Sequence, residues 1–143
     1  MQPSHVLVPL DGSPLAQEAL EHALAVFDCE VTVLNVITPL DSPLSEGGLL
    51  EADKDRFEAA QKRSEELIER GRQQAETAGR EVETVVETGD PAEAILSYVE
   101  THDIDHVVMG SHGDEHGRIA RRLLGTVTTA VVGDAPVTVT VVK

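Results

Sequence analysis

Short apolar runs alternate with segments of helical period along the whole chain, and this alternation constrains the fold more than any other feature. In the helical segments, apolar residues recur every three or four positions; these segments are 15–27, 51–78, 92–99 and 126–132. The runs between them predict strands at His5–Leu10, Val31–Ile37, Val82–Glu87, His106–Met109 and Val137–Val142. Strands separated by helices favour a parallel sheet covered on both faces, so the sequence predicts an α/β fold.

Two local signals support this division of the chain. Ser13 is a good N-cap residue, and Pro14 suits the first position of the helix that follows. The charged residues of segment 51–78 lie away from its apolar stripe, which predicts a solvated helix face. The last strand alternates Val and Thr and is typical of an edge strand, which pairing with a second copy would protect.

Composition limits the possible partners and the compartment. The 143 residues, 41% of them hydrophobic, predict one domain with a true core, residues 1–143. A net charge of −15 repels nucleic acids and anionic membranes, so neither is an expected partner. The acidic, lysine-poor composition favours a halophilic source over an ordinary acidic protein. The chain shows no signal peptide or membrane-spanning run, and we expect it to be cytoplasmic. The single Cys29 excludes an internal disulfide and is expected to be a buried structural thiol.

The most specific motif follows the fourth strand. The apolar run Val107–Met109 ends in Gly110-Ser111-His112-Gly113, and Gly125-Thr126 later opens a new apolar stretch as a helix start would. Free backbone amides and the dipole of a helix both favour an anion at such a point. Glycines there would leave room for a ribose or phosphate against the backbone and would permit positive φ angles. The motif therefore predicts a nucleotide cradle, although turns also use Gly-x-x-Gly.

Three loops are expected at the carboxyl edge of the sheet, where parallel sheets bind ligands: Pro9–Ser13, Val36–Pro39 and Gly110–Thr126. Asp11 could accept a hydrogen bond from a ribose hydroxyl or an adenine amine. Thr126 offers a hydroxyl and an amide to a phosphate oxygen.

Neither a catalytic group nor a dedicated metal site is predicted. Ser13 and Ser111 are better explained as a cap and a loop hydroxyl than as nucleophiles. The acidic and histidine side chains that follow the motif match no standard transition-metal spacing; they are His112, Asp114, Glu115 and His116.

The same residues resemble the universal stress protein family over nearly the full length. The resemblance rests on Val-Leu-Val-Pro-Leu-Asp-Gly-Ser at 6–13, Val-Leu-Asn-Val at 33–36, Gly-Asp-Pro-Ala-Glu-Ala-Ile at 89–95, and the motif at 107–113 with Leu-Leu-Gly-Thr-Val at 123–127. It implies a three-layer α/β/α, Rossmann-like fold with strand order 3-2-1-4-5. It also implies a homodimer through Val137–Val142.

The ATP-binding branch of that family supplies an expected set of binding residues. The resemblance places adenine against Asp11 and the main chain of Val36, with Pro9 and Leu10 nearby. It places the ribose and phosphates against Gly110, Gly113, Gly125, Thr126 and Val127, and Met109 and His112 complete the set. The expected ligand is ATP, or ADP or AMP, with Mg²⁺ as a candidate companion ion.

The chain departs from the family signature Gly-x2-Gly-x9-Gly-Ser/Thr in its last connection. Eleven residues separate Gly113 from Gly125, and Asp114-Glu115 directly follow the second glycine. Two carboxylates near a triphosphate weaken binding unless a divalent cation bridges them, although Arg118, Arg121 and Arg122 could compensate.

We therefore expect an ATP-binding, stress-response regulatory dimer rather than an enzyme. One alternative is a family member that does not bind nucleotide and serves as a dimeric interaction module. The other is a slow ATP hydrolase in which His112 or Glu115 orients a water.

Overall fold

The computed structural model describes residues 2–39, 50–111 and 125–143, with side chains of the long second helix described from residue 54 onward. Its helices are α1 (Pro14–Val26), α2 (Leu50–Thr77), α3 (Pro91–Thr101) and α5 (Thr126–Asp134). Its strands are β1 (His5–Pro9), β2 (Glu30–Ile37), β3 (Glu83–Thr88), β4 (His106–Gly110) and β5 (Thr138–Val142). All neighbouring strands pair in parallel, in the order β3-β2-β1-β4-β5. This confirms the predicted fold class and strand order.

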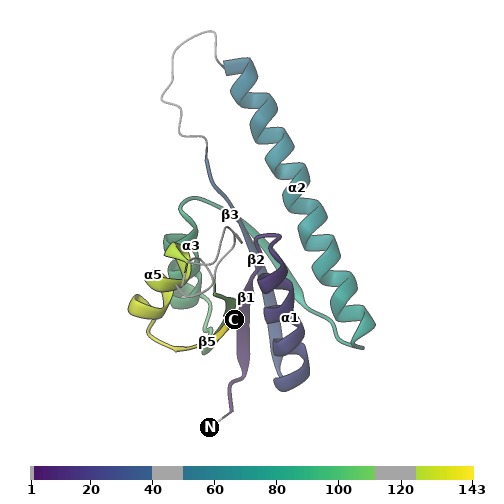
Figure 1. Ribbon diagram of the computed structural model, residues 1–143, viewed down its shortest axis with the longest axis vertical. Coiled ribbons are helices and arrows are strands. Elements are labelled where there is room, and N and C mark those ends of the chain that lie inside the picture. Colours follow the sequence, from purple (N-terminus) through teal and green to yellow (C-terminus); the bar gives the residue numbers. More distant parts are fainter. Residues whose placement is uncertain (1, 40–49, 112–124) are drawn as a thin grey trace.

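The sheet is the middle of three layers (Figure 1), with α1 and α2 on one face and α3 and α5 on the other. Successive side chains of a strand point to opposite faces, so β1 contributes to two cores. Val6 and Val8 pack in the core under α1 and α2, whereas Leu7 packs in the core under α3 and α5. The near-continuous apolar run of β1 is thus explained by burial on both sides.

The sequence predicted helix beginnings better than helix ends. The Ser13 side chain accepts a hydrogen bond from the Ala16 amide at 3.2 Å, with proline at the start of α1, as expected. The last helix, however, continues two residues beyond the predicted end at Val132. A glycine ends a helix readily when it turns to positive φ, and Gly133 does not do so.

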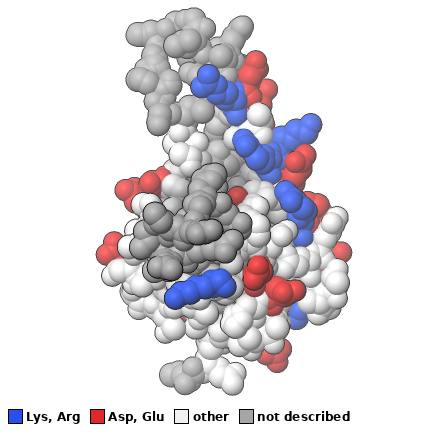
Figure 2. Space-filling model, in the orientation of Figure 1, with Lys and Arg blue, Asp and Glu red and all other residues white. Residues whose placement is uncertain are grey.

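Helix α2 carries much of the charge of the described surface. In Figure 2 many of the blue Lys and Arg side chains lie along the edge of the molecule where α2 runs, and others lie lower on the same face. Lys54, Arg63 and Arg70 are all exposed, which confirms the predicted solvated face. On the opposite side Gly71 lets the helix approach the sheet closely, because a Cβ there would lie 2.9 Å from Leu10 Cδ1.

Two further expectations concern the edges of the sheet and the cysteine. β5 pairs only with β4 in the described sheet, so its prediction as an edge strand is confirmed. Cys29 is half-buried rather than buried, because it lies just before β2, at the end of the core. Burial still raises the pKa of its thiol, which favours the protonated form. No described helix combines the length and the apolar character that a membrane crossing requires.

Candidate functional site: a pocket at the carboxyl edge of the sheet

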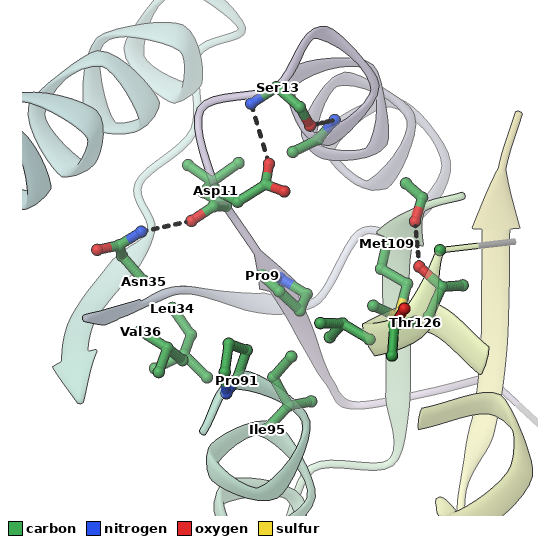
Figure 3. Close-up of a pocket in the computed structure, with 16 residues that line it drawn as sticks. Pro9, Asp11, Ser13, Leu34, Asn35, Val36, Pro91, Ile95, Met109 and Thr126 are labelled. Carbon is green, nitrogen blue, oxygen red and sulfur yellow. Dashed lines mark hydrogen bonds between the residues drawn. The ribbon is translucent and has the colours of Figure 1, made fainter. Parts of the chain in front are cut away.

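A pocket of about 610 Å³ opens where β1, β2 and β4 end (Figure 3). This is where the strand order reverses, because the chain leaves β1 for β2 on one side and later returns to β4 on the other. The volume is that of a typical small-molecule site. The lining residues are Pro9, Leu10, Asp11, Ser13, Ala16, Leu34, Asn35, Val36, Pro91, Ile95, Met109, Gly110, Gly125, Thr126, Val127 and Thr128.

One side of the pocket is apolar. In Figure 3, Pro9 lies centrally and faces a group formed by the end of β2 and the start of α3. Leu34 is fully buried and Ile95 is 2% exposed, so this wall is continuous with the core beneath α3. Such a wall, without a charged side chain, suits a flat apolar group. Its side chains are Pro9, Leu34, Val36, Pro91, Ile95 and Met109.

A buried amide fixes the loop that follows β1. Asn35 Nδ2 donates to the Leu10 carbonyl at 2.7 Å, and the Leu10 amide donates to the Leu34 carbonyl at 2.8 Å. The loop is therefore tied to β2 by both polar groups of the Leu10 backbone. Backbone groups two residues apart in a strand point to the same side, so those of Val36 point toward the space just beyond Leu10.

Asp11 stands at the rim between this loop and α1. Its Oδ1 accepts a hydrogen bond from the Ser13 amide at 2.9 Å, and the side chain is exposed. Its Oδ2 receives no hydrogen bond from any described residue. The carboxylate therefore keeps an acceptor available for a hydroxyl or amine in the pocket.

Helix α5 begins at the opposite rim without a side-chain cap. Its N-cap is Gly125, with φ −66° and ψ 164°, and no side chain caps the first turn. The next residues, Thr126, Val127 and Thr128, all line the pocket. The Thr128 hydroxyl donates to the Gly110 carbonyl at 2.8 Å and does not serve as a cap. Uncapped first-turn amides and the positive end of the helix dipole can together hold an anion.

The structure brings together nine of the eleven binding residues that the sequence predicted. All nine line the same pocket; they are Pro9, Leu10, Asp11, Val36, Met109, Gly110, Gly125, Thr126 and Val127. His112 and Gly113 lie outside the described residues, as does the acidic connection 114–124.

The positive φ angle expected of the motif glycines is wrong for Gly110 and Gly125, and the room for a ligand is wrong for Gly110. Neither Gly110 nor Gly125 has a positive φ angle. A Cβ on Gly110 would lie 2.8 Å from Leu15 Cβ and 2.9 Å from the Leu15 carbonyl carbon. Gly110 therefore lets β4 pass close to α1 rather than making room for a ligand. The positive φ in this region belongs to Gly12, at +89°, where the chain turns from β1 into α1.

Sequence reasoning missed part of the lining, namely Ser13, Ala16, Leu34, Asn35, Pro91, Ile95 and Thr128. Asn35 left a usable signal, because an amide inside a buried apolar strand needs hydrogen-bond partners. The sequence Gly89-Asp90-Pro91 left another, since it places a second helix start at the same edge of the sheet. The apolar residues left none, because a pocket wall and a core have the same composition.

Comparison with known proteins gives consistent results. The model of the Universal stress protein family matches residues 3–143. The universal stress protein MJ0531 of Methanocaldococcus jannaschii is 30% identical, over 96% of this chain and 81% of that protein. The solved structure of universal stress protein UspA from Lactobacillus plantarum has a TM-score of 0.85 at 26% identity, covering 100% of this chain and 99% of that one.

Two more distant solved structures share the fold and were determined with nucleotides. One is an Arabidopsis thaliana protein of the same family with AMP bound, with a TM-score of 0.72 and 22% identity, covering 99% of this chain and 92% of that one. The other is a universal stress protein in complex with cAMP, also with a TM-score of 0.72 and 22% identity, covering 100% of this chain and 99% of that one.

Proposed function

The chain belongs to the universal stress protein family, and from this premise we propose that it is an ATP-binding regulatory protein. ATP, or ADP or AMP, occupies the pocket at the carboxyl edge of the sheet. Solved relatives with AMP and with cAMP support an adenine nucleotide as the ligand class.

The adenosine part of the ligand lies between β1, β2 and α3. The apolar wall that includes Val36, Pro91 and Met109 receives the adenine ring. The backbone of Val36 recognises the edge of the ring, and the free oxygen of Asp11 accepts from an adenine amine or a ribose hydroxyl.

The uncapped start of α5 is the observation that carries the proposal. Because Gly125 has no side chain, the first-turn amides of Thr126 and Val127 stay available for a phosphate. Mg²⁺ shields the triphosphate from carboxylates at the rim.

The proposed role is binding rather than catalysis. Among the described lining residues, the hydroxyls of Ser13 and Thr128 are already engaged, one as a helix cap and one on a carbonyl. None of these lining residues is a histidine, cysteine or lysine. The protein then signals through its conformation and as a homodimer, joined along the free edge of β5.

The direct test is to denature protein purified from its host and to identify any released molecule by mass spectrometry. A companion thermal-shift series compares ATP, ADP, AMP and GTP, with and without Mg²⁺. Because the acidic, lysine-poor composition supports a high-salt source, the series is run at low and at molar KCl. We expect an adenine nucleotide to be released, and a higher melting temperature with ATP than with GTP.

The competing functions predict other results. Absence of nucleotide together with no thermal shift at either salt concentration would contradict the proposal and favour a dimeric interaction module. Steady release of phosphate from ATP, abolished by replacing His112 or Glu115, would favour the slow hydrolase.

A further inference from the structure

A second cluster of functional side chains lies at the opposite, amino-terminal edge of the sheet. One ring nitrogen of His5, one oxygen of Glu30 and one oxygen of Glu83 all lie within 4.8 Å of one another. These residues begin β1, β2 and β3. His5 is five residues before Leu10, so the cluster is roughly 13–16 Å along β1 from the pocket.

Strand register puts the three side chains on one face. His5 is paired with Glu30, and Thr32 is paired with Glu83. Side chains two residues apart share a face, so Glu30 and Thr32 point the same way. The cluster is thus a product of the sheet itself and does not depend on a loop.

The surroundings hold His5 in place. The fully buried Thr32 hydroxyl lies 2.7 Å from His5 Nε2 and 3.5 Å from Glu83 Oε1, joining the imidazole to the carboxylate. The His5 amide donates to Asp105 Oδ1 at 3.2 Å, and the Ser4 amide donates to Asp105 Oδ2 at 3.0 Å. Burial raises the pKa of Asp105, but these hydrogen bonds outweigh it and the net pKa is lowered. Asp105 is therefore an ionised anchor for the strand.

Among the described residues, no lysine or arginine forms a salt bridge with Glu30 or Glu83. The one salt bridge found there joins Arg72 to Glu69. The negative charge of these carboxylates also affects the pKa of the Tyr98 hydroxyl. Burial raises the pKa of Tyr98, and the charges of Glu83, Glu87 and Glu30 raise it further. Two carboxylates so close repel each other unless a cation lies between them.

We propose that His5, Glu30 and Glu83 bind a divalent transition metal, with Zn²⁺ as the natural occupant. An imidazole nitrogen with two carboxylate oxygens is a donor set that zinc accepts, whereas magnesium and calcium prefer oxygen alone. The three ligand atoms, within 4.8 Å of one another, would have to draw closer to share one ion, which the exposed Glu30 and Glu83 side chains allow. Water completes the coordination, and the ion joins the starts of three strands.

The test is titration of Zn²⁺ into chelator-treated protein by calorimetry, with Co²⁺ absorption as a second probe. We expect one equivalent to bind at this site and raise the melting temperature. Glu30→Gln and Glu83→Gln each lower the affinity by at least about tenfold, and His5→Ala does the same. In chelator the two glutamine variants melt at or above the wild-type temperature, because a repulsion has been removed.

Two controls separate this site from others. Glu87 lies on β3 with Glu83 but near the far end of that strand, outside the cluster. Glu87→Gln should therefore leave the Zn²⁺ affinity within about twofold of the wild-type value. The double variant His112→Ala, His116→Ala removes the two histidines that flank Asp114 and Glu115 in the sequence and should leave the affinity unchanged. Loss of the binding in this double variant, or wild-type affinity in Glu30→Gln and Glu83→Gln, overturns the proposal. So does the absence of any Zn²⁺ binding.

Discussion

Helices α1 and α5 both begin at the rim of the same pocket, but they differ in whether a side chain accepts hydrogen bonds from the amides of the first turn. At α1, the Ser13 hydroxyl accepts from the Ala16 amide, and Asp11 accepts from the Ser13 amide. At α5, the N-cap is Gly125 and no side chain takes up the first-turn amides. A helix start that satisfies its own amides contributes shape to the pocket, whereas one that leaves them free contributes positive potential.

The difference gives the pocket a polarity. A carboxylate lies at the α1 side and free amide donors lie at the α5 side, across the residues at the end of β4. A ligand with hydroxyls or amines at one end and a negative charge at the other would be oriented by this arrangement. The third helix at this edge follows the α1 pattern, because Asp90 accepts from the Glu93 amide at 3.1 Å. Only α5, of the described helices at the pocket, is left open.

The largest effect on binding is expected when α5 is given a side-chain cap of its own. Gly125→Asp places a carboxylate where the N-cap backbone already has the extended geometry of Ser13 and Asp90. The carboxylate would take the first-turn amides and repel a phosphate, so we expect ATP affinity to fall by about 100-fold or more. Isothermal calorimetry measures the affinity, and urea denaturation checks that the free energy of unfolding is unchanged or slightly higher.

A graded pair of controls separates capping from charge. Gly125→Ser adds a neutral cap and should weaken ATP binding less than the aspartate does. Gly125→Ala adds a methyl group without a cap and should weaken it least. Equal affinity in all three variants and the wild type would show that the α5 amides do not bind the phosphate.

A second change tests the residue that connects the two helix starts. Gly110 lies so close to α1 that a Cβ on it would be 2.9 Å from the Leu15 carbonyl carbon, and its own carbonyl accepts from the Thr128 hydroxyl of α5. In Gly110→Ala the new Cβ would meet backbone atoms that cannot move aside, and we expect a loss of about 1–3 kcal/mol in the free energy of unfolding. Urea denaturation measures the loss. Gly133→Ala is the control, because nothing lies within 4 Å of a Cβ there. Equal stability of the two variants would show that the close approach is not essential.

Gly110 and Gly125 also show how far the sequence could predict the site. Hydrophobic period, caps and turn residues predicted the fold, because each is a local signal with one dominant structural reading. The same signals predicted that Gly110 and Gly125 border the pocket. They could not show what each glycine does, since a glycine that admits a helix and one that admits a ligand look alike in sequence. For Gly110, only the position of Leu15, which is distant along the chain, shows that the glycine admits a helix.

The remaining gaps have a similar physical origin. Ile95 and Leu34 have the composition of core residues, and whether such a side chain borders a cavity depends on how α3 is placed over β2. The cluster of His5, Glu30 and Glu83 has no sequence signature either, because strand register brings together residues that no sequence spacing relates. The sequence predicted the helices and strands themselves but not the contacts between them.

The smallest expected effect comes from opening the start of α1. In Ser13→Ala the Ala16 amide loses its cap, while the hydrogen bond from the backbone of residue 13 to Asp11 remains possible. We expect the free energy of unfolding to fall by about 1 kcal/mol, measured by urea denaturation. ATP affinity should stay within about threefold of the wild type, because the Asp11 carboxylate still faces this end of the pocket. Ser13→Thr retains a capping hydroxyl and is the control. A loss of ATP affinity in Ser13→Ala as large as in Gly125→Asp would mean that the two helix starts contribute equally to binding, and the distinction between them would fail.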